Sequence, residues 1–252
     1  MWPKLGPIPT YSILYSAGVI SHFFVSYWIA RRLGLRRRVW IVVSICYMEG
    51  MFTGAKVLYD VVQVGQFSLA ALFDIEHWMK GGLWGGLLVY LVLAVPLAAV
   101  LAKDKRTGLD LVVLTLPIPL FLSKLGCLFN GCCYGRATSL PWAITFPEGS
   151  TAPTGVPLHP TQIYELIVIV GVYGVFKLLN YDRWRGSMFW WFLIIYGLGR
   201  SLTEVWRGDQ EKHAYFGPLS LSQVICLIGA ALSVIALYWF CKRRVPAAVS
   251  SG

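Results

Sequence analysis

The chain has 252 residues, of which 57% are hydrophobic and 13% are charged, and its formal net charge at neutral pH is +10. Its mean hydropathy of +0.62 is far above that of a soluble domain of this size. These values exclude an ordinary soluble enzyme and predict an integral membrane protein. A charge of +10 would suggest a nucleic acid partner if the protein were soluble, but the distribution of the basic residues favours another explanation.

Seven apolar segments approach the roughly 20 helical residues that a bilayer core requires. They are expected near residues 11–30, 39–59, 82–102, 109–122, 161–179, 187–202 and 219–240. The first of them lacks the basic region and the cleavage site of a signal peptide, so we expect a retained helix. The predicted fold class is an all-α polytopic membrane protein with about seven transmembrane helices, which form a single transmembrane domain over residues 1–252.

The orientation follows from the basic residues, because short loops rich in Lys and Arg stay in the cytoplasm. Fourteen of the 22 Lys and Arg residues fall in one alternating set of loops and ends, in clusters at 31–38, 103–106, 177–185 and 242–244. This asymmetry predicts an N-terminus outside and a C-terminus in the cytoplasm. It also accounts for much of the net charge, so no nucleic acid partner is expected.

Two adjacent segments on the predicted outer side have an unusual composition. Ser123 to Arg136 combines glycines, three cysteines, an asparagine and two cations between apolar segments. Membrane-depth backbone this rich in glycine must be buried in protein or line a polar cavity, so we expect this stretch to form the floor of a site. The long loop 137–160 contains five prolines and is predicted to be a lid or a small external subdomain.

Arg200, Glu204 and Arg207 have the i, i+4, i+7 spacing that places side chains on one helical face. Ionisable residues in an apolar segment are costly unless they are paired, so they usually face the interior and mark function. Arginine suits bidentate recognition of phosphate. The three residues are therefore a candidate phosphate site, and a structural salt bridge at the membrane edge is the alternative.

Two helix starts also carry candidate residues. Lys80 precedes the glycines that open the third span and is either a cation at the lip of the site or a lysine that snorkels to the headgroups. His159 to Glu165 opens the fifth span, with Thr161 as the expected cap and a polar face that continues to Glu165. A helix N-terminus favours anions, although an ordinary capped helix start explains the same pattern.

Cys127, Cys132 and Cys133 are the only cysteines that are candidates for chemistry. They allow a disulfide between Cys127 and one of the pair, or a nucleophilic thiol activated by Lys124 or Arg136. No metal site and no cofactor are expected, because paired C-x2-C spacing is absent and no histidine stands at ligand spacing.

Taken together, three motifs resemble the prolipoprotein diacylglyceryl transferases in sequence, order and spacing. They are Lys124-x-Gly126 to Asn130-Gly131-x-x-Tyr134-Gly135-Arg136, then His159-Pro160-Thr161-Gln162-Ile163-Tyr164-Glu165, then Gly199-Arg200-x-x-x-Glu204-x-x-Arg207-x-Asp209. The likeness spans the chain from Gly6-Pro7 to Ser222-Gln223.

The resemblance implies a multi-pass enzyme of the bacterial inner membrane whose site faces the periplasmic side. Such an enzyme transfers the diacylglyceryl group of phosphatidylglycerol to the thiol of a lipobox cysteine in a preprolipoprotein, and glycerol phosphate leaves. Its partners would be phosphatidylglycerol, membrane lipid and the lipobox segment.

By position, the resemblance assigns roles to particular residues. Those expected to act in catalysis are Arg200, Lys80, Lys124 and Arg136. Those expected to bind substrate are Asn130, Gly131, Gly135, Glu204, Arg207, His159, Gln162 and Tyr164, with Cys127, Cys132 and Cys133 as redox or thiol candidates.

The chain departs from the family signature at four positions. Lys124, Cys127 and Cys132 replace an Arg, an Asn and a Glu. Lys80 stands where the family has a His, which removes a base with a pKa near neutrality. Three other functions therefore remain open: a relative that uses phosphatidylglycerol with another acceptor, a membrane thiol-disulfide relay, and a non-catalytic lipid binder.

Overall fold

The computed structural model describes residues 4–6, 8–54, 56–57, 83–209, 214–216 and 219–242. Most of these residues are helical. The chain divides into two compact units, Met1–Asn130 and Gly131–Gly252, and each unit is described by itself below.

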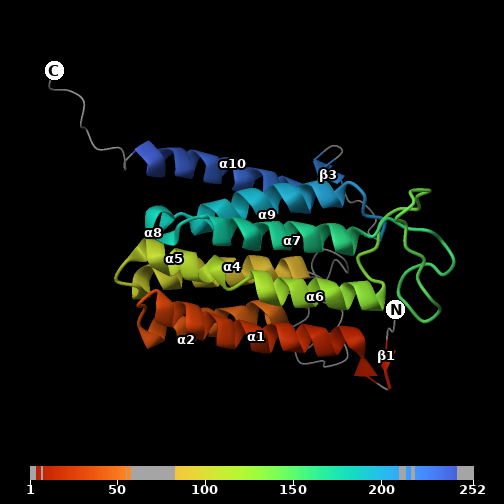
Figure 1. Ribbon diagram of the computed structural model, residues 1–252, viewed down its shortest axis with the longest axis horizontal. Helices are drawn as coiled ribbons and strands as arrows, with labels where there is room; N and C mark the ends of the chain where they lie inside the picture. Colours follow the sequence, from red (N-terminus) through yellow and green to blue (C-terminus); the bar gives the residue numbers. More distant parts are fainter. Residues whose placement is uncertain are drawn as a thin grey trace. The chain divides into compact units, whose positions relative to one another are not determined.

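The first unit consists of apolar helices preceded by a short hairpin (Figure 1). The hairpin pairs β1 (Lys4–Leu5) with β2 (Ile8–Pro9) in antiparallel register. The helices are α1 (Thr10–Arg32), α2 (Arg37–Glu49), the π-helix η1 (Gly50–Gly54), α4 (Leu83–Leu101), α5 (Lys105–Leu114) and α6 (Pro117–Asn130).

Small residues let these helices pack closely. A Cβ added at Gly50 would lie 2.6 Å from the carbonyl oxygen of Gly86, so α4 approaches the backbone of η1 directly. Gly18 lies against Pro119, and Gly126 lies against Tyr11. Because the later residue of α1 meets the earlier residue of α6, these two helices run antiparallel.

The second unit contains α7 (Thr161–Leu178), α8 (Tyr181–Trp184), α9 (Met188–Glu204) and α10 (Leu221–Lys242). Its short strands β3 (Ala214–Phe216) and β4 (Leu219–Ser220) pair in antiparallel register. Helix α9 packs on both of its longer neighbours, since Gly199 lies against Val168 of α7 and Gly197 against Cys226 of α10. The functional side chains of this unit therefore project from a helix that is covered on two sides.

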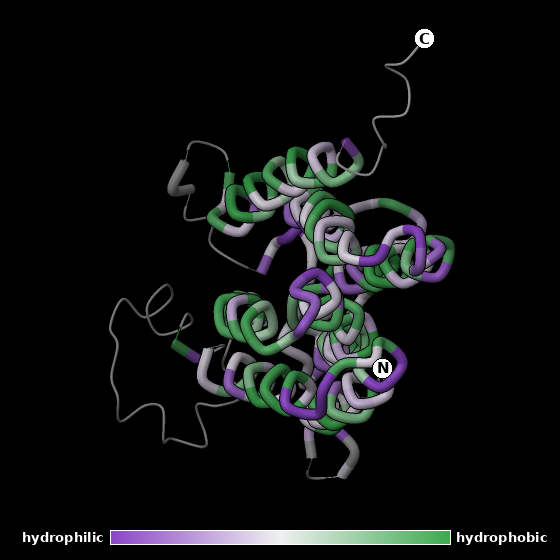
Figure 2. Tube along the Cα trace, turned by 90° about the vertical axis from the view of Figure 1, so that its left-hand side faces the viewer, coloured by the Kyte–Doolittle hydropathy of each residue, from purple (hydrophilic) through white to green (hydrophobic). Residues whose placement is uncertain are grey.

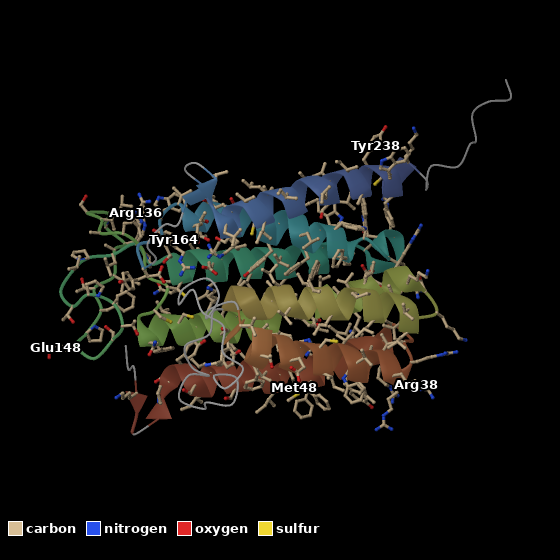
Figure 3. All side chains as sticks on the ribbon, turned by 180° about the vertical axis from the view of Figure 1, so that it is seen from behind. Arg38, Met48, Arg136, Glu148, Tyr164 and Tyr238 are labelled. Carbon is tan, nitrogen blue, oxygen red and sulfur yellow. The ribbon has the colours of Figure 1, made fainter. Side chains whose placement is uncertain are left out.

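Each of the seven expected spans overlaps at least one helix, and the count of seven membrane spans stays a prediction. Four helical stretches are long and apolar enough to cross a membrane: Thr10–Arg32, Lys105–Asn130, Thr161–Leu178 and Leu221–Lys242. Figure 2, which looks along the helices, shows many apolar residues on the helical turns, mixed with more polar ones. Apolar side chains such as Met48 and Tyr238 are exposed and point outward (Figure 3). The prediction of a helical membrane protein is confirmed.

The stretch 123–136 is more regular than the sequence suggested. Ser123 to Asn130 forms the last turns of α6, and only the residues after Asn130 leave the helix. The fourth span therefore extends beyond the predicted 109–122. Pro117 and Pro119 do not interrupt α6, because they lie in its first turn, where proline is tolerated. A short break near Thr115 separates α5 from α6.

Residues 137–160 form a segment without helices but with its own apolar core. Phe146, Ala152 and Leu158 are buried in this core, and Ile144 pairs with Leu158 through two backbone hydrogen bonds of 3.0 Å. That the segment lies outside the membrane and acts as a lid stays a prediction.

Candidate functional site

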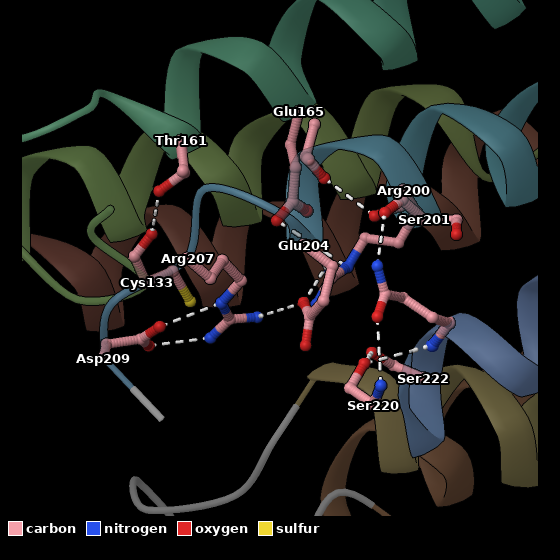
Figure 4. A network of polar contacts seen from close by, with 12 residues as sticks. Cys133, Thr161, Glu165, Arg200, Ser201, Glu204, Arg207, Asp209, Ser220 and Ser222 are labelled. Atoms are coloured by element: carbon pink, nitrogen blue, oxygen red, sulfur yellow. Dashed lines mark hydrogen bonds and ion pairs between the residues drawn. The ribbon is translucent and has the colours of Figure 1, made fainter. Parts of the chain in front are cut away.

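Arg200 is the single cation of α9, and only 1% of its surface is exposed. One turn later on the same helix, Glu204 accepts a hydrogen bond from the Arg200 guanidinium. Glu165 of α7 approaches from the other side, with its Oε1 atom 3.8 Å from Arg200 Nε (Figure 4). Two carboxylates from two helices thus hold one guanidinium in place and offset the cost of burying its charge.

Arg207 extends this network beyond the end of the helix. Its Nε and NH2 atoms donate to the two carboxylate oxygens of Asp209 at 2.9 and 2.7 Å, a bidentate pair. Its NH1 atom lies 3.8 Å from Glu204 Oε2. Burial by itself would lower the pKa of Arg207, but Cys133, Asp209 and Glu165 raise that pKa well above its ordinary value. Arg207 therefore remains protonated.

The expectation that Arg200, Glu204 and Arg207 share one face of a continuous helix is wrong in part. Helix α9 ends at Glu204, and the next three residues form a tight turn. In it Val205 and Arg207 donate to carbonyls three residues earlier, as is common at helix ends. The turn still brings Arg207 to Glu204, so the three residues meet as predicted.

The residues after Asn130 are fixed by the first turn of α7. Gln162 Nε2 donates to the carbonyl oxygen of Cys132 at 2.8 Å, and Thr161 Oγ1 donates to that of Cys133 at 2.5 Å. The expected Thr161 cap is therefore wrong, because the N-cap residue is Pro160, without a side-chain cap bond. Since Gln162 is fully buried, it positions this backbone directly.

Gly135 and Arg136 join three loops of the second unit. The amide of Gly135 donates to the carbonyl oxygen of His159, and that of Arg136 to the carbonyl oxygen of Trp206. A Cβ at Gly135 would lie 2.6 Å from the same His159 oxygen, so this close approach requires glycine. Arg136 is exposed, and its Nε also donates to the carbonyl oxygen of Arg207 at 3.4 Å.

An aromatic group surrounds Tyr164. Its hydroxyl accepts a hydrogen bond from Trp142 Nε1 at 2.9 Å and lies 3.1 Å from His159 Nδ1. The Trp206 ring lies edge-on to the Tyr164 ring, with centroids 5.8 Å apart. Trp142 and Trp206 were not predicted, because isolated tryptophans are expected at membrane interfaces anyway.

Glu165 and Asp209 were also absent from the predicted site residues. Both lie in the motifs that carried the family resemblance, and Glu165 was noted only as the inward end of a polar helix face. The sequence did offer a way to find them. A buried guanidinium needs a carboxylate partner, so Arg200 and Arg207 should have prompted a search for nearby acidic residues.

Three predicted residues belong to the first unit, and one lies outside the described residues. Lys124 and Cys127 are buried, and Asn130 is the last residue of α6; all three are described only within their own unit. Lys80 falls outside the described residues. A joint role of Lys124 and Arg200 therefore stays a prediction.

None of the six cysteines forms a disulfide, so the disulfide considered from the sequence is absent from the structure. Cys132 and Cys133 are half-buried, and their sulfur atoms lie within 4.8 Å of each other. The Cys133 sulfur lies close to Arg207 (Figure 4). Two adjacent thiols do not by themselves complete a tetrahedral metal site, and the expected absence of a metal stays a prediction.

The fold is that of a helical membrane protein, and a buried arginine–carboxylate network in such a protein is typical of a functional site. Residues 3–239 match the model of the family described as prolipoprotein diacylglyceryl transferase. The chain belongs to this family.

Several relatives of the chain carry the name phosphatidylglycerol–prolipoprotein diacylglyceryl transferase. One from Geobacter sulfurreducens is 31% identical over 243 residues, which cover 89% of both chains. One from Clostridium tetani is 31% identical over 76% of this chain and 77% of its own. One from a Nostoc strain is 28% identical over 96% of this chain and 89% of its own.

Proposed function

We propose that this protein transfers the diacylglyceryl group of phosphatidylglycerol to the cysteine thiol of a prolipoprotein. The sulfur attacks the glycerol carbon bonded to the phosphate oxygen. A carbon–sulfur bond forms, the carbon–oxygen bond breaks, and its electron pair leaves with glycerol phosphate, while the proton of the thiol passes to water. The observation that carries the proposal is the buried Arg200, held by Glu204 and Glu165 in a chain of the transferase family.

The leaving phosphate gains negative charge as its bond to carbon breaks, and a preorganised cation stabilises that charge most in a water-poor site. Arg200 supplies this cation, and its two carboxylate neighbours fix the direction of the guanidinium. Arg207 and the exposed Arg136 would add positive potential, while Lys124 and Lys80 take the positions at which the family has an Arg and a His.

The proposal includes four further predictions, on the number of membrane spans, the orientation of the chain, the side that the site faces and the segment that covers it. The protein would cross the bacterial inner membrane seven times, with its N-terminus outside and its C-terminus in the cytoplasm. The site would face the periplasmic side, where a lipobox segment arrives. The ordered segment 137–160 would cover this site.

The test is a transfer assay on purified protein in micelles that contain phosphatidylglycerol and a lipobox peptide. We expect glycerol phosphate release together with a peptide mass increase. Arg200→Ala should abolish both. Arg200→Lys should restore little activity, because lysine keeps the positive charge but lacks the two parallel N–H donors with which a guanidinium binds phosphate. The control is Arg183→Ala, which removes an exposed arginine of α8 and should retain full activity.

The same assay distinguishes the other functions. Lipid consumed without peptide modification would indicate another acceptor, and phospholipid binding without any product would indicate a lipid binder. The neighbouring sulfur atoms of Cys132 and Cys133, which form no disulfide, favour a thiol-disulfide relay as the second candidate. A relay requires that a Cys132→Ser, Cys133→Ser variant loses function while Arg200→Ala keeps it.

A further inference from the structure

The segment 31–38, from the end of α1 to the start of α2, carries five arginines, and two of them, Arg31 and Arg37, line a common hollow. This hollow has a volume of about 450 Å³ and is lined by Tyr27, Ala30, Arg31, Leu35, Arg37 and Trp40. It lies where the apolar helix α1 ends and α2 begins, which is a membrane–water boundary by composition. Arg36 and Arg38 are exposed and do not line it, and Arg38 points away from the helices (Figure 3).

The charge of the hollow is positive, since two arginines line it. In the part of the chain that the structure describes, no carboxylate pairs with Arg31 or Arg37. This differs from Arg200 and Arg207, which both have carboxylate partners. Arg31 NH1 donates only a long hydrogen bond, of 3.3 Å, to the Tyr27 hydroxyl.

The N-terminus of α2 opens at the same place. Arg37 is its first residue, and the N-cap residue Arg36 makes no side-chain cap bond. The first amides of a helix need acceptors from outside the helix, and the helix dipole favours an anion there. The hollow thus combines two guanidinium groups with an uncapped helix start.

The walls of the hollow and the surface beside it are apolar and aromatic. Trp40 is nearly buried, and its ring packs on those of Phe23 and Tyr27 with centroids 4.9 and 5.1 Å away. Below the hollow, α1 exposes Phe23, Phe24 and Tyr27 to between 43% and 65%. An occupant with an anionic head and apolar chains fits this arrangement, whereas a soluble anion would use only the upper part.

We propose that this hollow binds the headgroup phosphate of an anionic phospholipid, with the acyl chains along the exposed aromatic face of α1. The lipid is distinct from the donor lipid. Tyr11, at the start of α1, lies beside Gly126 of α6, whereas the hollow begins at Tyr27. Sixteen residues of helix separate these positions by about 24 Å, so Lys124 and the hollow lie near opposite ends of α1. The proposal does not rest on the transferase activity.

The test is lipid titration of the purified full chain in detergent, with bound lipids counted by native mass spectrometry. The probe is phosphatidylserine, which is anionic and lacks the glycerol head of the proposed donor; phosphatidylcholine is the neutral comparison. Arg31→Gln, Arg37→Gln should weaken phosphatidylserine binding about tenfold, since basic side chains at a surface contribute strongly to anionic lipid binding. Phosphatidylcholine binding should not change.

The matched control is Arg36→Gln, Arg38→Gln, which removes the same charge from the same loop but leaves the hollow intact. It should change phosphatidylserine binding less than about twofold, because its charges act only through the solvent. All four side chains are exposed, so both variants should unfold at the same temperature as the parent. Equal losses in the two variants would mean general surface charge and would overturn the proposal. So would displacement of phosphatidylserine by inorganic phosphate but not by chloride at equal ionic strength, which would assign the hollow to a soluble phosphate.

Discussion

Arg200 keeps its charge at a buried position because carboxylates reach it from two directions. Glu204 comes from the same helix and Glu165 from α7. Burying such a group alone would be very unfavourable, and an ion pair of this kind contributes little net stability once desolvation is counted. Little net stability is therefore expected from the network, which agrees with the proposed role of Arg200 as a fixed cation for a phosphate.

Glu204→Gln tests this network directly. The variant removes the carboxylate that contacts both Arg200 and Arg207, and breaking a buried pair on one side costs about 3–5 kcal/mol. We expect a lower unfolding temperature and a loss of transfer activity even where the protein remains folded. The control is Glu148→Gln, at an exposed position of the segment 137–160, which should change neither. A stable, active Glu204→Gln variant would contradict the assigned role.

At the scale of residues, the sequence predicted which residues belong to the candidate site better than it predicted which residues they contact. The spacing of Arg200 and Glu204 predicts their ion pair, because positions four apart meet on a helix. Glu165 lies 35 residues before Arg200 in the sequence, so no local rule indicates that contact. Thr161 looked like a cap because its residue type and position fit, but its hydroxyl has a tertiary partner in the Cys133 carbonyl.

At the scale of elements, the segment 137–160 depends on a very small core. Phe146 is 1% exposed and packs with Ala152 and Leu158. It also lies 3.1 Å from the position of a Cβ at Gly131, so it supports the turn that follows Asn130. The sequence predicted that the segment would be ordered, but five prolines do not show which residue forms its core.

Phe146→Ala should loosen this segment and leave the helices intact. Truncation of a buried phenylalanine costs about 3–5 kcal/mol, which exceeds what a core of so few residues can absorb. Limited proteolysis should then cut within 137–160 much faster than in the parent protein, with no change in helix content by circular dichroism. Leu140→Ala removes an exposed apolar side chain of the same segment and should leave the cleavage rate unchanged. Slow cleavage of both variants would show that other contacts hold the segment.

Helix boundaries were predicted less well than helix positions. Apolar composition locates each span, but it does not show that α6 continues through the polar and glycine-containing stretch to Asn130. Polar and charged residues usually mark the end of an apolar span, so a prediction from composition ends the helix before Lys124. In the structure Lys124 is buried within its unit, and the helix continues past it.

For the whole molecule, the orientation stays a prediction, and the ends of three helices carry residues suited to the headgroup region. A cation lies over an aromatic ring near the end of α1, α7 and α10: Arg32 over Trp28 at 3.5 Å, Lys177 over Tyr173 at 5.4 Å and Lys242 over Trp239 at 5.5 Å. Aromatic rings and snorkelling cations occupy the headgroup region of a bilayer. In the seven-span order, α1, α7 and α10 are the first, fifth and seventh spans, so all three would end on the same side.

Cysteine labelling in spheroplasts tests this orientation. Cys241 is exposed at the end of α10, and a variant that keeps it alone, with the other cysteines replaced by serine, reports on that end. Thr151→Cys, in the same background with Cys241→Ser, reports on the segment 137–160, where Thr151 is exposed.

A maleimide that cannot cross the membrane should label position 151 in intact spheroplasts and position 241 only after permeabilisation. The physical reason is the excess of Lys and Arg at the end of α10 and in the loops of the same set, which retains them in the cytoplasm. Labelling of both positions after permeabilisation serves as the control for folding and access. The reverse pattern would invert the topology and place the arginine network of α9 on the cytoplasmic side, where a lipobox segment would have to be modified before export.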